Sequence, residues 1–432
     1  MSGSPSVSKY EMPGILGALG GRRFHVMAKP AGSTCNLDCA YCFYLSKETL
    51  PRGPGPGRMS DETLELFVRQ YIAGVTADEV VFTWQGGEPT LRGLDFYRRV
   101  VELQKKHAKP GQRIENDLQT NGTLLNDEWC RFLKENRFLV GLSIDGPRAL
   151  HDRYRVLKNQ QPTFDRVVQA AQRLVEHGVP FNTLTCVNRV NAKKPREVYR
   201  FLRDELKSTR MQFLPVVEYK GFQTTAPYVW NAESLPKAGS PEARPGHQNS
   251  VVTDWSVAPD DWGSFLIWVF DEWRRKDLGR VLVNHFETLV AQHLGEPSQM
   301  CVYSEFCGKG VALEHDGTVY ACDHFVYPEY RTGHIKDRSL ADLVFSPTQV
   351  KFGHAKSELL PGECRRCEYL SDCWGECPKN RVLLTRDGEP GLNYLCHGLK
   401  KYFKHALPHV QKIVGRLPPK SSDKEREASP NW

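Results

Sequence analysis

The chain has 432 residues, of which 40% are hydrophobic and 25% are charged, a composition typical of folded globular proteins. Its 58 Lys and Arg exceed its 51 Asp and Glu by only 58 − 51 = 7, and the basic residues are scattered, which argues against nucleic-acid binding. The sequence has no run of about 18 apolar residues, so we expect no transmembrane helix and no membrane partner.

The first 21 residues are rich in Ser, Gly and Pro and lack the basic and apolar segments of a secretory signal. We therefore expect a flexible leader and a cytoplasmic protein. The length suggests two domains. Because the cytoplasm keeps thiols reduced, the spacing of the 13 cysteines indicates metal binding rather than disulfides.

The first predicted strand, residues 23–29, leads into a loop with Cys35, Cys39 and Cys42 at Cys-x3-Cys-x2-Cys spacing. Three thiolates can hold three irons of a four-iron cluster and leave the fourth iron open to a small molecule. A structural zinc site normally has four protein ligands, so the missing ligand favours a reactive centre. A zinc site completed by a distant residue is the alternative.

Strand and helix patterns then alternate as far as residue 217. A helix starts at Ser60, whose hydroxyl is suited to cap it. The predicted strands that follow are 79–84, 113–118, 139–144, 181–187 and 211–217, and the predicted helices are 94–107, 127–136, 164–177 and 195–207. Six such β/α units predict an α/β fold with a parallel sheet, whose strand ends share one face.

Polar turns follow three of these strands, at residues 85–89, 119–122 and 143–147. The Gly86–Gly87 pair allows the backbone to approach a ligand closely. Each turn alone could be an ordinary connection, but three at equivalent strand ends, together with the cysteine loop, indicate a site.

The chain beyond residue 219 has a different composition. Residues 219–254 are rich in Pro, Gly, Ser and Asn and predict a long insertion, and residues 262–273 predict an aromatic helix packed in the core. The charged tail after Pro418 predicts disorder. Cys130 and Cys186 fall within a predicted helix and a predicted strand, where we expect them to be buried.

Eight cysteines lie in the last third of the chain, enough for two complete sets of four metal ligands. They are Cys301, Cys307, Cys322, Cys364, Cys367, Cys373, Cys377 and Cys396. By number alone they fit two iron–sulfur clusters or two zinc sites equally well. The open-cluster loop upstream favours clusters, because it needs redox partners.

The cysteine loop with Tyr41, the turn at 86–89 and the six β/α units resemble radical S-adenosylmethionine (SAM) enzymes. The later cysteine spacing resembles their SPASM extension. The stretches 320–327, 373–379 and 393–396 are similar to anaerobic sulfatase-maturating enzymes. This resemblance implies a partial (β/α)6 radical SAM barrel followed by a C-terminal iron–sulfur SPASM domain.

The resemblance also implies domain boundaries and cofactors. The expected segments are a leader at 1–21, the barrel at 22–219, an insertion and helical connector at 220–300, the SPASM domain at 301–410 and a disordered tail at 411–432. The expected cofactors are SAM and three 4Fe-4S clusters.

By the same resemblance, Cys35, Cys39 and Cys42 hold the SAM-binding cluster. Gly87, Ser143, Arg155, the main chain at Val217 and Tyr41 contact SAM. Asp323 is the implied catalytic base. The implied auxiliary cluster ligands are Cys301, Cys307, Cys322 and Cys377 in one set, and Cys364, Cys367, Cys373 and Cys396 in the other.

The implied activity is oxidation of a Cys or Ser of a sulfatase to Cα-formylglycine through a 5′-deoxyadenosyl radical. The expected partners are an unfolded or nascent sulfatase polypeptide and an electron donor such as flavodoxin or ferredoxin. An alternative is a SPASM enzyme that forms thioether or carbon crosslinks in a ribosomal peptide. A second alternative is a non-catalytic metal-binding protein. Iron and zinc content separates the latter from the two enzymes.

Overall fold

The computed structural model describes residues 23–51, 53–229 and 232–416. The predicted leader at 1–21 and the tail beyond residue 416 lie outside the described residues. Within them, ten strands form one sheet in the order β10-β9-β8-β1-β2-β3-β4-β5-β6-β7. The strands are β1 (His25–Lys29), β2 (Glu79–Trp84), β3 (Arg113–Thr120), β4 (Phe138–Ser143), β5 (Phe181–Val187), β6 (Arg210–Pro215), β7 (Leu282–Val283), β8 (Gly310–Glu314), β9 (Thr318–Tyr320) and β10 (Arg331–His334).

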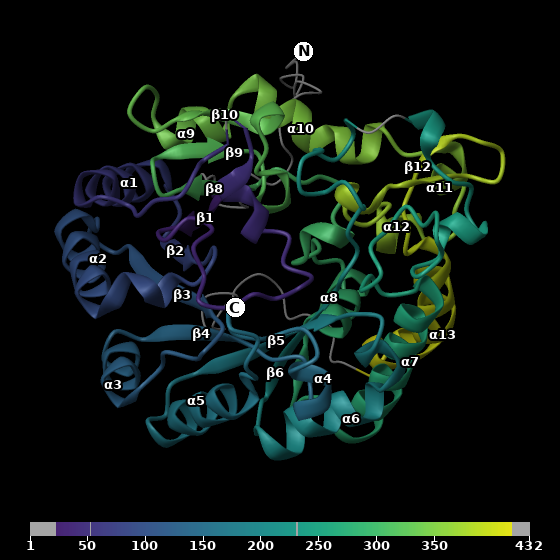
Figure 1. Cartoon of the computed structure of the whole chain (residues 1–432), viewed down its shortest axis with the longest axis horizontal. Helices are drawn as coiled ribbons and strands as arrows, with labels where there is room; N and C mark the ends of the chain where they lie inside the picture. The colour runs from purple at the N-terminus through teal and green to yellow at the C-terminus, as the bar shows by residue number, and fades with distance from the viewer. Residues whose placement is uncertain (1–22, 52, 230–231, 417–432) are drawn as a thin grey trace, which may run out of the picture.

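The predicted parallel α/β architecture is confirmed. Strands β1 to β6 pair consecutively and in parallel, and Figure 1 shows the sheet curving around the centre of the molecule with its helices outside. The helices of this half are α1 (Asp61–Gly74), α2 (Gly93–His107), α3 (Asp127–Glu135), α4 (Arg148–His151), α5 (Phe164–Glu176) and α6 (Pro195–Arg200).

Local sequence explains these elements. The Ser60 side chain accepts a hydrogen bond from the Thr63 amide at 3.2 Å and caps α1, as predicted. The predicted helix at 195–207 is α6 followed by a π-helical turn, Phe201–Glu205. Along β2, Val80, Phe82 and Trp84 are buried, while the residues between them are half-buried. This alternation gives each strand one face toward the helices and one toward the interior of the barrel.

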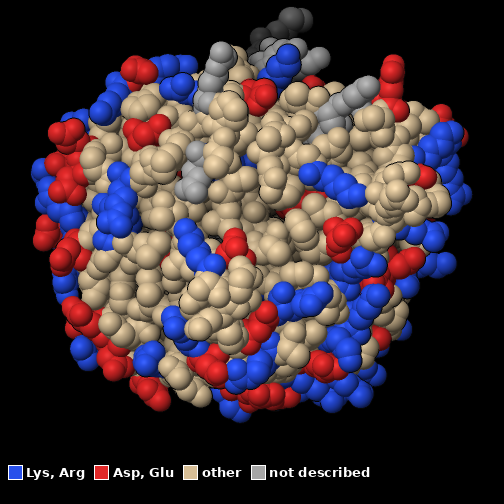
Figure 2. Space-filling model, in the orientation of Figure 1, with Lys and Arg blue, Asp and Glu red and all other residues tan. Residues whose placement is uncertain are grey.

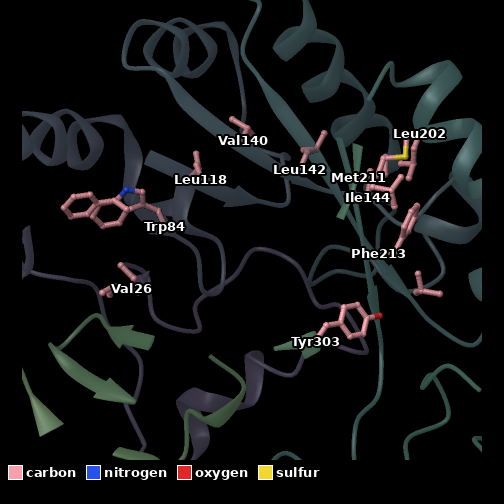
Figure 3. Close-up of a cluster of buried hydrophobic side chains, with 14 of the residues drawn as sticks. Val26, Trp84, Leu118, Val140, Leu142, Ile144, Leu202, Met211, Phe213 and Tyr303 are labelled. Atoms are coloured by element: carbon pink, nitrogen blue, oxygen red, sulfur yellow. The ribbon is translucent and has the colours of Figure 1, made fainter. Parts of the chain in front are cut away.

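The face toward the helices forms the main hydrophobic core. Figure 3 shows Trp84, Leu118, Val140 and Leu142 contributed by three neighbouring strands, and all four are fully buried. Burial of a side chain of this size stabilises a fold by about 1.5–3 kcal/mol. The core therefore holds the strand order, and with it the relative positions of the turns at the strand ends.

The C-terminal part of the chain joins the same sheet. Strand β8 pairs in parallel with β1, with Lys29 opposite Glu314, and β9 and β10 continue antiparallel from it. A two-stranded sheet of β11 (Leu383–Leu384) and β12 (Pro390–Leu392) lies apart. The remaining helices are α7 (Pro259–Lys276), α8 (Asn284–His293), α9 (Leu340–Val344), α10 (Pro347–Glu358), α11 (Gly362–Arg365), α12 (Leu370–Cys373) and α13 (Cys396–Val414).

The predicted start of the disordered tail at residue 411 is wrong by a few residues. Helix α13 continues to Val414, because Val410 is fully buried and Ile413 and Val414 pack against the core. The predicted insertion is also more engaged than its composition indicates, since Tyr330 Oη donates to the Pro227 carbonyl at 2.6 Å. It therefore packs on the segment that follows β9.

The surface agrees with the charge pattern of the sequence. Figure 2 shows Lys and Arg interspersed with Asp and Glu on one face of the described chain, rather than gathered into a basic stripe. In the described residues, no helix is both long and apolar enough to cross a membrane.

Candidate functional site

The loop with Cys35, Cys39 and Cys42 follows β1 and lies inside the curve of the sheet (Figure 1). Two backbone hydrogen bonds tie it to the segment after β4, from the Asp38 amide to the Val156 carbonyl at 2.8 Å and from the Ala40 amide to the Tyr154 carbonyl at 3.3 Å. The three thiols are half-buried and lie close enough to affect one another electrostatically. The structure thus brings the predicted triplet together.

Burial controls the protonation of these cysteines. It raises the pKa of the Cys35 thiol to about 12, with a further contribution from Glu88, and it also raises the pKa of Cys39 and Cys42. The free side chains are therefore neutral thiols at pH 7. Binding of a metal, which needs thiolates, would release these protons.

The turn after β2 is in contact with the cysteine loop through its backbone. The Gly87 amide donates to the Gly32 carbonyl and the Glu88 amide to the Thr34 carbonyl, both at 2.9 Å. A Cβ on residue 87 would lie 2.1 Å from the Thr34 oxygen, far inside van der Waals contact. Only glycine fits here, and the group that it approaches is the backbone of the cysteine loop.

Glu88 is completely buried and connects two turns. Its carboxylate accepts hydrogen bonds from the Thr90 amide at 3.0 Å, the Thr120 hydroxyl at 2.8 Å and the Asn121 amide at 2.8 Å. Burial raises the pKa of Glu88 above its ordinary value, although these donors oppose the shift. Glu88 therefore fixes the turns after β2 and β3 relative to each other, a role that the sequence did not predict.

Arg155, Tyr41 and Asp145 form a buried polar cluster behind the cysteine loop. Arg155 Nε lies 3.2 Å from Asp145 Oδ1, Tyr41 donates to the same carboxylate, and the guanidinium lies 5.6 Å from the Tyr41 ring centre. Asp145 was only part of a predicted turn, yet it positions both predicted SAM contacts.

Cys186 also belongs to this cluster, and the prediction that it is buried in the core is wrong. Its side chain is half-buried, its sulfur lies 3.9 Å from Arg155 Nη2, and its amide donates to Asp145 Oδ1 at 3.0 Å. The side-chain alternation along β5 directs it into the barrel. Cys130, in contrast, is fully buried as predicted.

The other two predicted SAM contacts lie further along the strand ends. Ser143, the last residue of β4, accepts a hydrogen bond from Gln119 at 3.0 Å. The Val217 carbonyl accepts a hydrogen bond from Lys379 Nζ at 2.5 Å, and Lys379 also pairs with Glu218 at 2.7 Å. Lys379 lies two residues after Cys377. The hydrogen bond therefore links Val217 to one of the eight later cysteines.

Asp323 forms an ion pair with Lys29, the last residue of β1. Lys29 is buried, and its ammonium also lies 4.6 Å from the ring centre of Tyr44, whose hydroxyl donates to Glu314. Burial acts to raise the pKa of Asp323, but the nearby Lys29 and His324 outweigh it and lower the pKa below its ordinary value. Asp323 is thus held as a carboxylate near the start of the cysteine loop.

The eight later cysteines gather in two groups. In the first group, Cys301 and Cys377 lie near enough to Cys322 to raise the pKa of its thiol. Cys301 acts in the same way on Cys307. The second group lines one cavity together with Tyr369, Leu399 and Phe403. The cysteines of this second group are Cys364, Cys367, Cys373 and Cys396.

Two buried cations show that the surroundings of these cysteines fit an anionic group. Lys356 and Arg381 are each 1% exposed. Within the described residues neither forms an ion pair with a carboxylate. Both donate to backbone carbonyls, and Arg381 also hydrogen-bonds to the Tyr228 side chain. Lys356 Nζ donates to the carbonyls of Cys301 at 2.7 Å and Val302 at 2.9 Å. Arg381 donates to the carbonyl of Lys356 at 2.7 Å.

An uncompensated buried charge is costly, so such cations require an anionic neighbour. Clusters with four thiolate ligands carry a net negative charge and would supply it. Zinc bound by four thiolates is anionic as well, so charge alone does not separate the two metals. The sequence contained no signal for either cation, because nothing in a scattered Lys or Arg indicates burial.

Comparisons with known proteins agree with this geometry. Residues 30–202 match the Radical SAM superfamily and residues 305–368 match the iron-sulfur cluster-binding SPASM domain. The chain is 44% identical over 386 residues to the Serine-type anaerobic sulfatase-maturating enzyme of Bacteroides thetaiotaomicron, covering 89% of this chain and 90% of that protein. It is 32% identical over 394 residues to the Cysteine-type anaerobic sulfatase-maturating enzyme of Clostridium perfringens, covering 91% and 98%.

A solved structure leads to the same family. Native anSMEcpe with bound AdoMet and Cp18Cys peptide superposes with a TM-score of 0.76 at 31% identity, covering 91% of this chain and 100% of that one. The coverage extends over both halves of the fold, from the cysteine loop to the later cysteine groups. The chain is therefore a radical SAM enzyme that belongs to the family of anaerobic sulfatase-maturating enzymes and carries a SPASM domain.

Proposed function

We propose that this enzyme oxidises a serine side chain in a sulfatase polypeptide to Cα-formylglycine. Enzymes of this family act on serine or cysteine. Three Serine-type relatives share 36–44% identity with the chain, and three Cysteine-type relatives share 30–32%. This difference supports serine as the preferred target.

The cofactors supply the redox chemistry, and the residues described above fit them. When bound, SAM on the cluster of the barrel supplies a radical that removes a hydrogen atom from the target Cβ, and the auxiliary clusters take up one electron. We assign the SAM-binding cluster to Cys35, Cys39 and Cys42. For the auxiliary clusters we propose one ligand set of Cys301, Cys307, Cys322 and Cys377, and a second of Cys364, Cys367, Cys373 and Cys396.

The residues around the cysteine loop suit the binding of SAM. The Arg155 guanidinium and the Ser143 hydroxyl can bind carboxylate and ribose oxygens. Gly87 lets the turn after β2 lie directly against the cysteine loop, where we expect its backbone to contact SAM, and Tyr41 offers an aromatic face. Because Asp145 binds both Arg155 and Tyr41, these two groups are preorganised before SAM arrives.

Asp323 is the proposed base that accepts the hydroxyl proton of the target serine. Its ion pair with Lys29 is the single observation that carries the proposal. Lys29 ends the strand that leads into the cysteine loop, so the pair brings the carboxylate next to the region where the radical forms. Loss of a hydrogen atom, a proton and an electron converts the CH2OH group to an aldehyde.

The setting follows from this chemistry. We propose a cytoplasmic location, where the 13 cysteines stay reduced. We further propose that the sulfatase is modified as an unfolded or nascent polypeptide and that a flavodoxin or a ferredoxin supplies the reducing electron.

The test compares two peptides that differ in one atom. Reduced, reconstituted enzyme is incubated with SAM and peptides carrying Ser-x-Pro-x-Arg or Cys-x-Pro-x-Arg. Mass spectrometry should show loss of two hydrogens from the serine peptide, and deuterium at its Cβ should appear in 5′-deoxyadenosine. Unchanged peptide mass while 5′-deoxyadenosine accumulates would contradict the substrate. Faster conversion of the cysteine peptide would contradict the preference for serine.

A further inference from the structure

Three metal-ligating side chains meet on the outside of the molecule, at the interface of α7 and α13. Asp271 lies on α7, and His405 and His409 lie on α13. Each offers one ligand atom, and these atoms lie within 4.8 Å of one another. Figure 1 shows α7 and α13 side by side, on the opposite side of the molecule from α1 and α2. The cluster contains no cysteine, and His405 lies nine residues, or about 14 Å, beyond Cys396 on α13.

We propose that Asp271, His405 and His409 bind a divalent transition-metal ion, with Zn²⁺ as the best fit. Two imidazoles and one carboxylate form a donor set that zinc accepts readily, with water in the fourth position. The same donors also suit Ni²⁺ and Co²⁺. Iron–sulfur chemistry requires thiolates, so this site would be chemically distinct from the three proposed clusters.

The geometry is close to that of an occupied site. His405 Nε2 lies 3.1 Å from Asp271 Oδ1, and two ligand atoms at about 2.0–2.1 Å from a tetrahedral zinc ion are about 3.3 Å apart. His405 and His409 are one helical turn apart and share a face of α13. Their ring centres are 5.5 Å apart, and both rings pack on Phe270. All three ligand atoms lie within 4.8 Å of one another, so binding of an ion would draw them closer together.

The carboxylate of Asp271 is already oriented for this role. Arg274, one turn further along α7, donates to Oδ1 at 2.8 Å, so both recorded hydrogen bonds of this carboxylate use the same oxygen. Among the described residues, Oδ2 has no hydrogen-bond partner. Arg274 would therefore act as the outer donor that orients a metal-binding carboxylate, the arrangement usual around such ligands.

A metal ion here would fix α13 on α7 at a second point. At the start of α13 the two helices already touch closely, because a Cβ on Gly398 would lie 1.8 Å from the Pro259 carbonyl oxygen. The proposed site lies two turns further along. Since α13 begins at Cys396, the ion would hold in place the helix that contributes a proposed cluster ligand.

Zinc binding is tested on the reconstituted enzyme, in which iron occupies the cysteines. After dialysis against micromolar Zn²⁺, elemental analysis should find one zinc per chain in addition to the iron. The variants His405→Gln and His409→Gln should each bind zinc at least 100-fold more weakly, while their iron content stays unchanged. The unchanged iron content shows that they are folded.

A matched control is His177→Gln. His177 pairs with Asp127 at 3.0 Å, nearly the same distance as the His405–Asp271 contact, but without a second histidine. This variant should bind zinc like the wild type. Zinc should also raise the melting temperature of the wild type and not that of His409→Gln. The proposal would be overturned if the wild type and both cluster variants bound equal amounts of zinc. It would also be overturned if His177→Gln lost as much zinc as the cluster variants.

Discussion

Replacement of Glu88 by glutamine should destabilise the enzyme without changing the shape of the side chain. Glu88 Oε1 accepts from Thr90 and Thr120, and Oε2 accepts from the Asn121 amide at 2.8 Å. In Glu88→Gln the oxygen keeps the contacts of Oε1, and the NH2 group then faces the Asn121 N–H, so two donors meet.

The cost can be worked from these contacts. Loss of one charge-assisted hydrogen bond costs about 1.5–3 kcal/mol, and an unsatisfied buried N–H about 1–3 kcal/mol. Burial raises the pKa of Glu88, because it is costly to remove the charged carboxylate from water. The neutral glutamine does not have this cost, which offsets part of the loss in stability. We therefore expect a net loss of about 2–4 kcal/mol.

Two measurements check this expectation, both on anaerobically reconstituted enzyme. The melting temperature should fall by about 2–4 °C, since the entropy of unfolding of a 432-residue chain is about 0.9 kcal/mol per degree. The Kd for SAM should rise about tenfold, equivalent to about 1.4 kcal/mol, because the turn that carries Gly87 is no longer fixed. Glu176→Gln, at an exposed residue that ends α5, is the control. If Glu88→Gln and Glu176→Gln behave alike in both measurements, Glu88 does not connect the loops.

Three further changes test other parts of the site. Asp323→Asn should slow peptide oxidation by on the order of 10²–10⁴-fold, because the base is lost, while reductive cleavage of SAM without peptide continues; loss of both activities would contradict a role specific to the target. Lys356→Met removes a buried cation and should lower the reduction potential of an auxiliary cluster in an EPR-monitored titration, and an unchanged potential would refute the proposed charge compensation. Cys396→Ala should reduce iron from about twelve to about eight per chain, whereas Cys130→Ala should leave it at about twelve, as elemental analysis can show.

Much of the barrel could be predicted from local patterns. The strand at 79–84 and the strand at 181–187 have the predicted bounds, because apolar side chains alternate with polar ones between clear turn residues. The Gly86–Gly87 pair indicated a close backbone approach but not its partner, which is the cysteine loop.

The features that escaped prediction depend on contacts between distant parts of the chain. Lys29 and Asp323 are 294 residues apart, and nothing local to either residue indicates the pair. Lys356 resembles any surface lysine in the sequence, yet it is buried against backbone carbonyls. Cys186 was misjudged because a strand pattern does not reveal which face of a barrel is apolar and which faces the ligand.

The hydrogen bonds between β1 and β8 have a consequence for protein engineering. A fragment that ends before β8 would leave β1 as an open sheet edge, and the complementary fragment would carry a bare β8, both prone to aggregate. Exchange of the C-terminal half between relatives therefore has to preserve the strand register that sets Lys29 opposite Glu314. A slip by one residue would turn the side chains of β8 to the opposite face and move the Asp323 carboxylate away from Lys29. Chimeras that keep β8 through Asp323 from the barrel donor should tolerate the exchange best.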